Sequence, residues 1–229
     1  MSDPASQRAL RAALGVGLAT AAYGVSFGAL SVASGLDIAQ TVFLSLVMFT
    51  GGSQFALIGV IAAGGTAAGG SAIASAALLG SRNAVYGMRM APVLNVRSWQ
   101  RLAAAWITID ESTAVALAQP HRAAARLGFW VTGLTVFIGW NLTTLLGALI
   151  GDAIGDTRAW GLDAAAAAAF LALLWPRLSS LQAGATAVGA AVVAAVLTPV
   201  LMPGLPVLVA ALVAVVIGVF NLFARRARS

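Results

Sequence analysis

The chain has 229 residues, of which 60% are hydrophobic and only 9% are charged, and its mean hydropathy is +0.94. A water-soluble domain of this composition would have too little polar surface to cover its core. The composition therefore predicts an all-α, polytopic membrane helix bundle of seven to eight helical segments, in a single integral membrane domain over residues 1–229.

The charged residues narrow the chemistry. All thirteen basic residues are arginine and the net charge is +6, so a Schiff-base lysine is excluded and the charge is better explained by membrane topology than by nucleic-acid binding. The chain has no cysteine, and its single histidine, His121, lies in a polar connector. We therefore expect no disulfide, no metal site and no cofactor.

The first apolar run covers residues 12–33, and we expect it to stay in the mature protein. Arg8 and Arg11 precede it, which favours a cytoplasmic N-terminus, whereas the following connector over residues 34–37 has no positive charge and is expected outside. The run is rich in small residues, which suit close helix packing in lipid or a path for a substrate. Its glycines are Gly15, Gly17, Gly24 and Gly28.

The second apolar stretch, residues 43–62, is interrupted at its centre. The interruption consists of Thr50, Gly51, Gly52, Ser53 and Gln54. Non-helical backbone at membrane depth is tolerated where it lines a cavity or is buried in protein, so we expect an interrupted helix beside a binding site. Ser53 is the expected N-cap of a half-helix that begins at Gln54, whose free N–H groups and positive dipole end suit a carboxylate. Whether residues 37–62 span the bilayer completely is left open.

Two arginines follow in a helix expected to run to about residue 90. Arg82 and Arg89 are seven residues apart and share a helical face with Tyr86. An arginine inside a membrane requires a partner or water. The alternative is that both arginines extend from a helix end toward the interface, because Pro92 predicts that the helix stops soon afterwards.

Residues 102–118 form an apolar stretch with Asp110 and Glu111 at its middle. We expect a spanning or re-entrant segment in which one acid carries a coupling proton or pairs with Arg82. The alternative is an interfacial helix with both acids in water.

The rest of the chain predicts spans at residues 128–150, 162–175, 183–197 and 205–223, with an acidic outer loop near residues 152–163. The arginines after the last span indicate a cytoplasmic C-terminus. Residues 35–46 also resemble residues 161–173, which is compatible with a parallel internal repeat or with chance matching in an Ala- and Leu-rich chain.

The sequence shows no pattern of an intramembrane serine, aspartyl or metalloprotease, so we do not expect an enzyme. Transport fits the remaining features. A non-catalytic membrane scaffold or assembly subunit is the alternative.

Several motifs, taken in order, resemble the AzlC family, the large subunit of bacterial branched-chain amino acid exporters. They are Gly24-Val25-Ser26-Phe27-Gly28, Phe49-Thr50-Gly51-Gly52-Ser53-Gln54-Phe55, Arg82-Asn83-Ala84-Val85-Tyr86-Gly87, Asp110-Glu111 and Gly161-Leu162-Asp163. The resemblance covers nearly the whole chain. Two positions depart from it, with Asn83 where the family usually has His and Ile109 where it usually has Thr.

The resemblance implies a permease of the bacterial inner membrane that exports leucine, isoleucine, valine and their analogues together with a small membrane subunit of the AzlD type. It would be a secondary transporter driven by an ion gradient, and the lack of a Gly-rich phosphate loop followed by lysine agrees. Residues 50–54 and Tyr86 are the expected substrate-binding residues. Arg82, Asp110 and Glu111 are the expected coupling residues.

Overall fold

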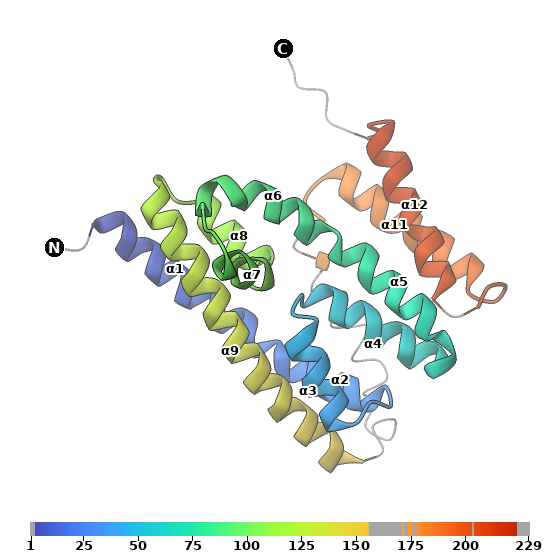
Figure 1. Cartoon of the computed structure of the whole chain (residues 1–229). Helices are drawn as coiled ribbons and strands as arrows, with labels where there is room; N and C mark the ends of the chain where they lie inside the picture. Colours follow the sequence, from blue (N-terminus) through green and yellow to red (C-terminus); the bar gives the residue numbers. More distant parts are fainter. Residues whose placement is uncertain (1–2, 156–170, 172–173, 176–177, 203, 224–229) are drawn as a thin grey trace. The chain divides into compact units, whose positions relative to one another are not determined.

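The computed structural model describes residues 3–155, 171, 174–175, 178–202 and 204–223, and the regular elements in these residues are all helical (Figure 1). The all-α expectation is confirmed for this part of the chain. The elements, in chain order, are α1 (Pro4–Ala22), α2 (Gly24–Ala33), α3 (Ile38–Val47), α4 (Gly52–Gly64), η1 (Thr66–Ala68), α5 (Gly69–Gly80), α6 (Arg82–Leu94), α7 (Trp99–Trp106), α8 (Asp110–Leu117), α9 (Arg122–Ile154), α11 (Leu181–Leu197) and α12 (Leu205–Val219).

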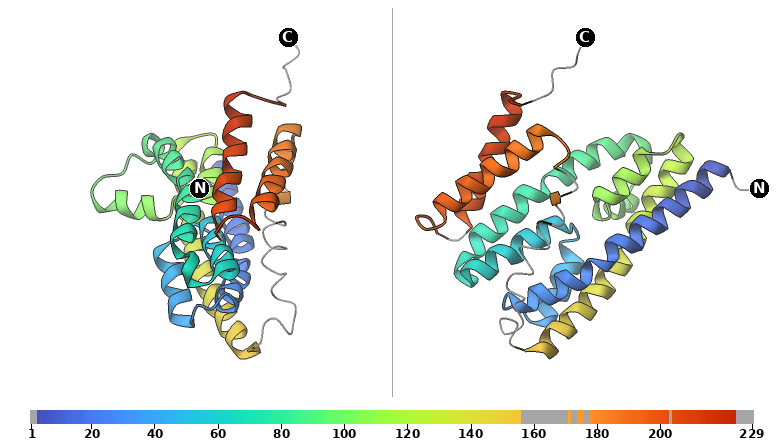
Figure 2. Two further views of the ribbon diagram at one scale, coloured as in Figure 1. Left: turned by 90° about the vertical axis from the view of Figure 1, so that its right-hand side faces the viewer. Right: turned by 180° about the vertical axis from the view of Figure 1, so that it is seen from behind.

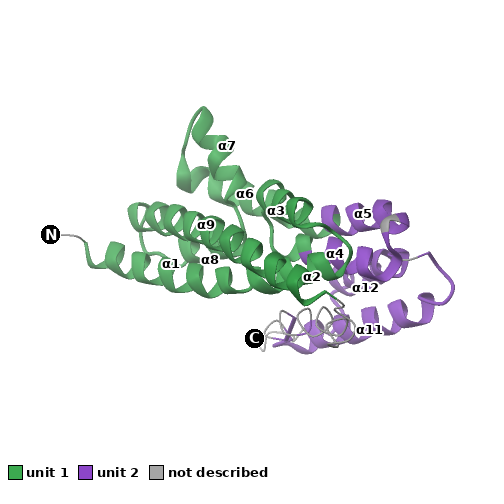
Figure 3. Cartoon of the chain, turned by 90° about the horizontal axis from the view of Figure 1, so that it is seen from below, with its two compact units in different colours: residues 1–54, 78–155 green, residues 55–77, 156–229 purple. Residues whose placement is uncertain are grey.

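The helices belong to two compact units (Figure 3). Unit 1 contains residues 1–54 and 78–155, and unit 2 contains residues 55–77 and 156–229. The division falls within α4 and within α5. A single domain over residues 1–229 stays a prediction.

Unit 1 is built on α9, the helix against which α1, α2, α3, α6 and α8 pack. Figures 1 and 2 show α1 and α9 lying side by side over most of their length. Glycines allow α2 to approach α9 closely, because a Cβ at Gly24 or Gly28 would overlap the α9 backbone, and a Cβ at Gly147 would overlap the α2 backbone. The packing role of the small residues is therefore confirmed for Gly24 and Gly28, whereas Gly15 faces open space.

The first helix begins earlier than the hydropathy predicted, at Pro4 instead of residue 12. Asp3 is the reason, because its side chain accepts hydrogen bonds from the N–H groups of Ala5 and Ser6, and Pro4 suits the first helical position. Only Tyr23, which keeps a right-handed conformation, separates α1 from α2.

Two stretches of the described chain are long and apolar enough to cross a bilayer, residues 4–33 and residues 122–154. Both pass this test by length and composition. The apolar helices α3, α4, α11 and α12 are shorter. The structure thus fits a helical membrane protein, and the expected number of seven to eight membrane segments is not confirmed.

Unit 2 contains the pair α11 and α12, which pack against each other. It also contains a small apolar cluster of Val60, Ala68 and Ala72. The turn before α12 lies on this part of α4 and α5, since a Cβ at Gly204, where φ is +88°, would overlap the side chains of Ser71 and Val60. The span predicted at residues 162–175 and the second copy of the proposed repeat fall mostly outside the described residues.

Candidate functional site

The predicted interruption lies between α3 and α4. Helix α3 ends at Val47 and α4 begins at Gly52, so residues 48–51 form the break. Gly51 has a φ of +39°, a conformation that glycine adopts without strain. The prediction of an interrupted helix is confirmed.

The start of α4 differs from the prediction by two residues. Because the helix begins at Gly52, Ser53 lies in its first turn, and the prediction that Ser53 is the N-cap is wrong. The Ser53 N–H donates to the Thr50 carbonyl over 3.2 Å, and the Thr50 hydroxyl donates to the Ser53 hydroxyl over 2.7 Å. These two bonds connect the break to the first turn, which begins at Gly52 instead of Gln54, and the first of them uses the N–H of Ser53.

The joint between α5 and α6 lies directly against this first turn. A Cβ built on Gly52 would lie 2.9 Å from Nη2 of Arg82, and one built on Gly80 would lie 3.1 Å from the Ser53 hydroxyl. Both glycines therefore allow a close approach that a side chain would prevent. The Arg82 guanidinium lies beside the positive end of α4.

Arg82 also contacts the start of α8. Its Nη1 lies 3.3 Å from Oδ2 of Asp110, and the two side chains are 27% and 20% exposed. The pairing of Arg82 with one of the two acids was one of the alternatives that the sequence offered, and the structure contains this contact. A role of the pair in ion coupling stays a prediction.

The acids stand at the beginning of a short helix. Asp110 and Glu111 occupy the first turn of α8, where the helix dipole favours negative charge. Helix α7 ends at Trp106, and the break over residues 107–109 is held by Ser112, whose hydroxyl donates to the Ile107 carbonyl over 2.8 Å and accepts the Ile109 N–H.

This break corrects the expectation for residues 102–118. Helices α7 and α8 have eight residues each, so each is about 12 Å long, well short of the roughly 30 Å of a bilayer core. A single spanning helix is wrong here, because the buried side chain of Ser112 bonds to the backbone of the break and stabilises it. The re-entrant alternative stays open. The interfacial alternative, with both acids in water, does not describe the paired and mostly buried Asp110.

The two arginines of α6 differ in their surroundings. Arg82 is paired with Asp110, whereas Arg89 is exposed. Helix α6 ends at Leu94, two residues after Pro92, as the proline predicted. Tyr86 is half-buried one turn beyond Arg82, and its assignment to the substrate site stays a prediction.

The sequence reasoning missed a group of buried polar side chains beside the α3–α4 break. They are Thr41 and Ser45 of α3 and Thr144 of α9, which join Gln54 of α4, and all four are 0% exposed. The spacing of Thr41 and Ser45 was a usable signal, since positions four apart share a helical face. Their partner Thr144 is 99 residues away from Ser45.

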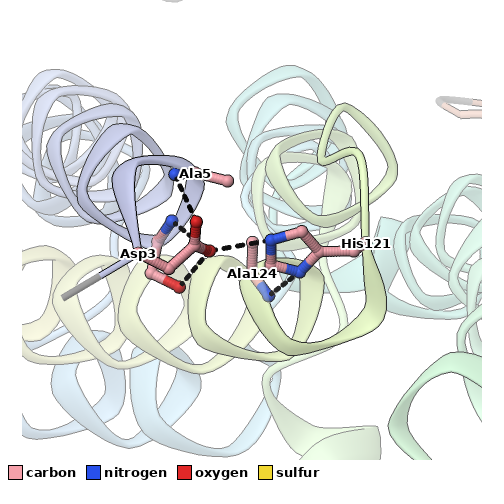
Figure 4. A network of polar contacts seen from close by, with 5 residues as sticks. Asp3, Ala5, His121 and Ala124 are labelled. Atoms are coloured by element: carbon pink, nitrogen blue, oxygen red, sulfur yellow. Dashed lines mark hydrogen bonds and ion pairs between the residues drawn. The ribbon is translucent and has the colours of Figure 1, made fainter. Parts of the chain in front are cut away.

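A second polar network connects the starts of α1 and α9 (Figure 4). His121 caps α9 by accepting the Ala124 N–H at Nδ1, so its other nitrogen carries the proton and donates to Asp3 over 2.8 Å. The hydrogen bond from the Ala5 backbone, followed by the one from His121, holds the pKa of Asp3 below its usual value. The Asp3–His121 pair is exposed, and its two side chains are too few to form a group of three metal ligands.

Among the residues that the structure describes, there is no group of three or more His, Cys, Asp or Glu side chains that could hold a metal ion. The described residues at the α4–α6–α8 junction bring together a guanidinium, two carboxylates, hydroxyls and the N–H groups of a helix start. This set can bind an anion and exchange a proton.

Comparison with known proteins supplies the family. The family model described as AzlC protein matches residues 15–154, more than half of the chain, and this segment contains the interrupted helix, Arg82 and both acids. No curated protein and no solved structure matches the chain. The chain belongs to the AzlC family, a transporter-type family associated with branched-chain amino acid transport.

Proposed function

We propose that this protein is a secondary transporter that exports leucine, isoleucine, valine and their analogues across the bacterial inner membrane. The family and the apolar helices support a membrane transporter. The substrate, the direction of transport, the inner membrane and the drive by an ion gradient are our proposal, as is a small membrane subunit of the AzlD type as partner.

One observation carries the proposal. The guanidinium of Arg82 has one nitrogen beside Gly52 at the start of α4 and another 3.3 Å from Asp110 at the start of α8. Three helices, α4, α6 and α8, thus begin around a single cation. A protein that only held helices together would not need three helix starts and an ion pair at one point in its interior.

The start of α4 is the proposed site of the substrate carboxylate. The N–H groups of Gly52 and Gln54 lie at the positive end of the helix, where the Ser53 N–H already donates to the Thr50 carbonyl. Interrupted helices in transporters present such ends to anionic substrate groups. Nη2 of Arg82 stands next to them and adds a positive charge. We assign residues 50–54 and Tyr86 to substrate binding.

Aromatic side chains near the break suit an apolar substrate side chain. Phe49 packs edge-on against Phe137 with ring centroids 5.1 Å apart, and a Cβ at Gly51 would lie 3.8 Å from the Trp140 ring. Apolar walls beside a few polar groups are typical of small-molecule sites. Leucine, isoleucine and valine require both features.

The acids are the proposed coupling groups. Arg82 can serve two carboxylates, that of Asp110 and that of a substrate, so a proton taken up by Asp110 changes how strongly Arg82 attracts the substrate. Glu111 follows Asp110 in the same helical turn, and the two acids can share one proton.

Reconstitution tests the proposal. Liposomes loaded with radiolabelled leucine would contain this chain alone, the chain with a small membrane subunit, or the subunit alone. Efflux that requires both proteins and an ion gradient supports an exporter pair, and efflux with the chain alone supports a transporter without the partner. A stable complex of the two proteins without leucine movement would reject transport in favour of a scaffold.

A further inference from the structure

Beside the interrupted helix lies a group of four buried polar side chains, of which the transport proposal uses only Gln54. Ser45 and Thr41 come from α3, Gln54 from α4 and Thr144 from α9, and each is 0% exposed. All four lie in unit 1. We call them the hydroxyl–amide cluster.

The contacts within the cluster are long. The hydroxyl oxygens of Ser45 and Thr144 are 3.4 Å apart, and Nε2 of Gln54 lies 3.4 Å from the carbonyl oxygens of both Leu44 and Ser45. Protein hydrogen bonds usually measure about 2.7–3.2 Å. The distances between the polar atoms of the cluster are therefore longer than those of ordinary hydrogen bonds.

Two oxygens of the cluster have no hydrogen-bond partner. They are Oε1 of Gln54 and Oγ1 of Thr41, which are both shielded from solvent. Leaving a buried polar atom unsatisfied costs about 1–3 kcal/mol. Two such atoms beside four loosely spaced oxygens, the hydroxyls of Ser45 and Thr144 and the carbonyls of Leu44 and Ser45, point to a bound group that accepts oxygen ligands.

The charge at this position favours a cation. Helix α3 ends at Val47, so its last carbonyl groups, Ser45 among them, have no partner in the next turn and form the negative end of the helix. A half-turn of the Gln54 amide would present Oε1 to the same point as the carbonyl oxygens of Leu44 and Ser45. The ligands would then all be oxygen atoms.

The kind of cation follows from the ligands. Calcium and magnesium bind through carboxylates, and the cluster contains none. Unwound carbonyls and half-helix C-terminal ends, in contrast, coordinate sodium in transporters with interrupted helices. We propose that Ser45, Gln54, Thr144 and the carbonyls of Leu44 and Ser45 bind a sodium ion, with Thr41 one turn away on the same face of α3.

The proposal that sodium binds depends on these oxygens alone. Its use as a second coupling ion, beside the proton assigned to the acids of α8, rests on the proposed transport function. If sodium is coupled to transport, α3 and α4 bind opposite charges at one break. Sodium would bind at the end of α3, and the substrate carboxylate would bind at the start of α4. Sodium would then assist substrate binding from the neighbouring half-helix.

Thermal unfolding of the purified chain in detergent tests binding without any transport assay. Sodium chloride would replace choline chloride at constant ionic strength, with potassium chloride as a further comparison. We expect sodium to raise the Tm by about 2–4 °C when it stands at about five times its Kd, and potassium or choline to have no such effect.

Two variants locate the site. Thr144→Val and Ser45→Ala each remove one hydroxyl ligand, and we expect the apparent Kd for sodium to rise about tenfold or more. Thr132→Val is the matched control, because Thr132 is equally buried on α9 but lies three turns, about 18 Å, from Thr144. It should keep the full sodium response.

Several outcomes would overturn the inference. An equal rise of the Tm with potassium or choline, or no rise with any salt, would show that the cluster does not select sodium. An unchanged sodium response in both ligand variants would place the sodium site elsewhere. A rise of the Tm with leucine in the absence of sodium, abolished by Thr144→Val, would assign the cluster to the substrate amine. Leucine flux that does not depend on sodium would keep the transport proposal and reject sodium as a coupling ion. A sodium response without any leucine flux would keep the site and reject the transport proposal.

Discussion

At the scale of single residues, the Arg82 guanidinium depends on two neighbours, one that leaves space for it and one that neutralises its charge. Gly52 contributes no side chain and thereby leaves room for the guanidinium, while Asp110 contributes the charge that the guanidinium needs. An arginine without a partner would be unfavourable at membrane depth. A change at either neighbour should therefore act through Arg82.

Gly52→Leu should abolish binding of leucine by the purified protein. The new side chain would start 2.9 Å from Nη2 of Arg82 and would cover the N–H groups to which we assign the carboxylate. Calorimetric titration with leucine measures the effect, and Gly70→Leu is the control, since a Cβ at Gly70 meets no atom within 4 Å. Unchanged affinity in Gly52→Leu would remove residues 50–54 from the substrate site.

Asp110→Asn should lower stability by about 1–3 kcal/mol, because it leaves the partly buried Arg82 without its ion pair. The double variant with Arg82→Gln should recover part of this loss, and unfolding of the two single variants and the double variant gives the coupling energy. Additive losses would show that the ion pair contributes nothing.

The coupling role needs a separate measurement. Asp110→Asn and Glu111→Gln should each be compared for gradient-driven leucine flux and for leucine counterflow, with the exposed Asp152→Asn as control. We expect at least one of the two variants to lose gradient-driven flux and keep counterflow, since exchange does not need the coupling proton. If both rates fall together in both variants, the acids are structural.

At the scale of elements, α9 is the helix that organises unit 1, and small residues make this possible. The contact with α2 is formed from both sides, by Gly24 and Gly28 of α2 and by Gly147 and Gly151 of α9. Lipid provides no hydrophobic driving force between helices, so close backbone packing has to stabilise the pair. The contact is consequently sensitive to a single methyl group.

Gly28→Ala should destabilise the protein by about 1–3 kcal/mol or more, because the added Cβ would overlap backbone atoms of Thr144 and Ala148. Gly15→Ala on α1 is the matched control, since its Cβ meets nothing within 4 Å, and it should be neutral or stabilising by up to about 1 kcal/mol. Thermal unfolding in detergent measures both. Equal midpoints in the two variants would contradict the packing shown for α2 and α9.

The cap of α1, Asp3, should respond to acid. The pKa of Asp3 is lowered in the folded protein, so its contribution to stability is complete above the usual aspartate value of about 3.9 and is lost as the pH falls through the lowered value. Asp3→Asn keeps an N-cap but cannot titrate. Wild-type Tm should therefore fall below about pH 4 more steeply than the Asp3→Asn Tm, and parallel curves would show that Asp3 does not contribute.

At the scale of the whole molecule, the arginine distribution predicts how the chain crosses the membrane. Arg8 and Arg11 favour a cytoplasmic N-terminus, and we expect the connector over residues 34–37 on the outer side. The chain contains no cysteine, so a single introduced cysteine is its only thiol that a maleimide can label. Gln7→Cys should react with a membrane-impermeant maleimide only in inverted vesicles, and Ala39→Cys only in intact cells. The reverse pattern would invert the proposed topology.

The sequence by itself determined the class of protein, the interrupted helix and the family. Hydropathy indicates membrane helices because a bilayer requires long apolar segments. Paired glycines inside such a segment indicate a break because glycine adopts non-helical conformations readily, and a break must be buried in protein because a bare turn cannot face lipid. The need of Arg82 for a partner also follows from local chemistry, and it led to the acids at residues 110 and 111. The motifs carried the resemblance that the family match over residues 15–154 confirms.

The tertiary structure alone decided which helices meet. Many helices of this chain have small faces and could pack in lipid, so no local pattern selects α9 as the centre of unit 1. Ser45 and Thr144 meet across 99 residues, and nothing near either one predicts the other. Hydropathy acts along one segment, whereas these contacts depend on pairs of segments that only folding brings together.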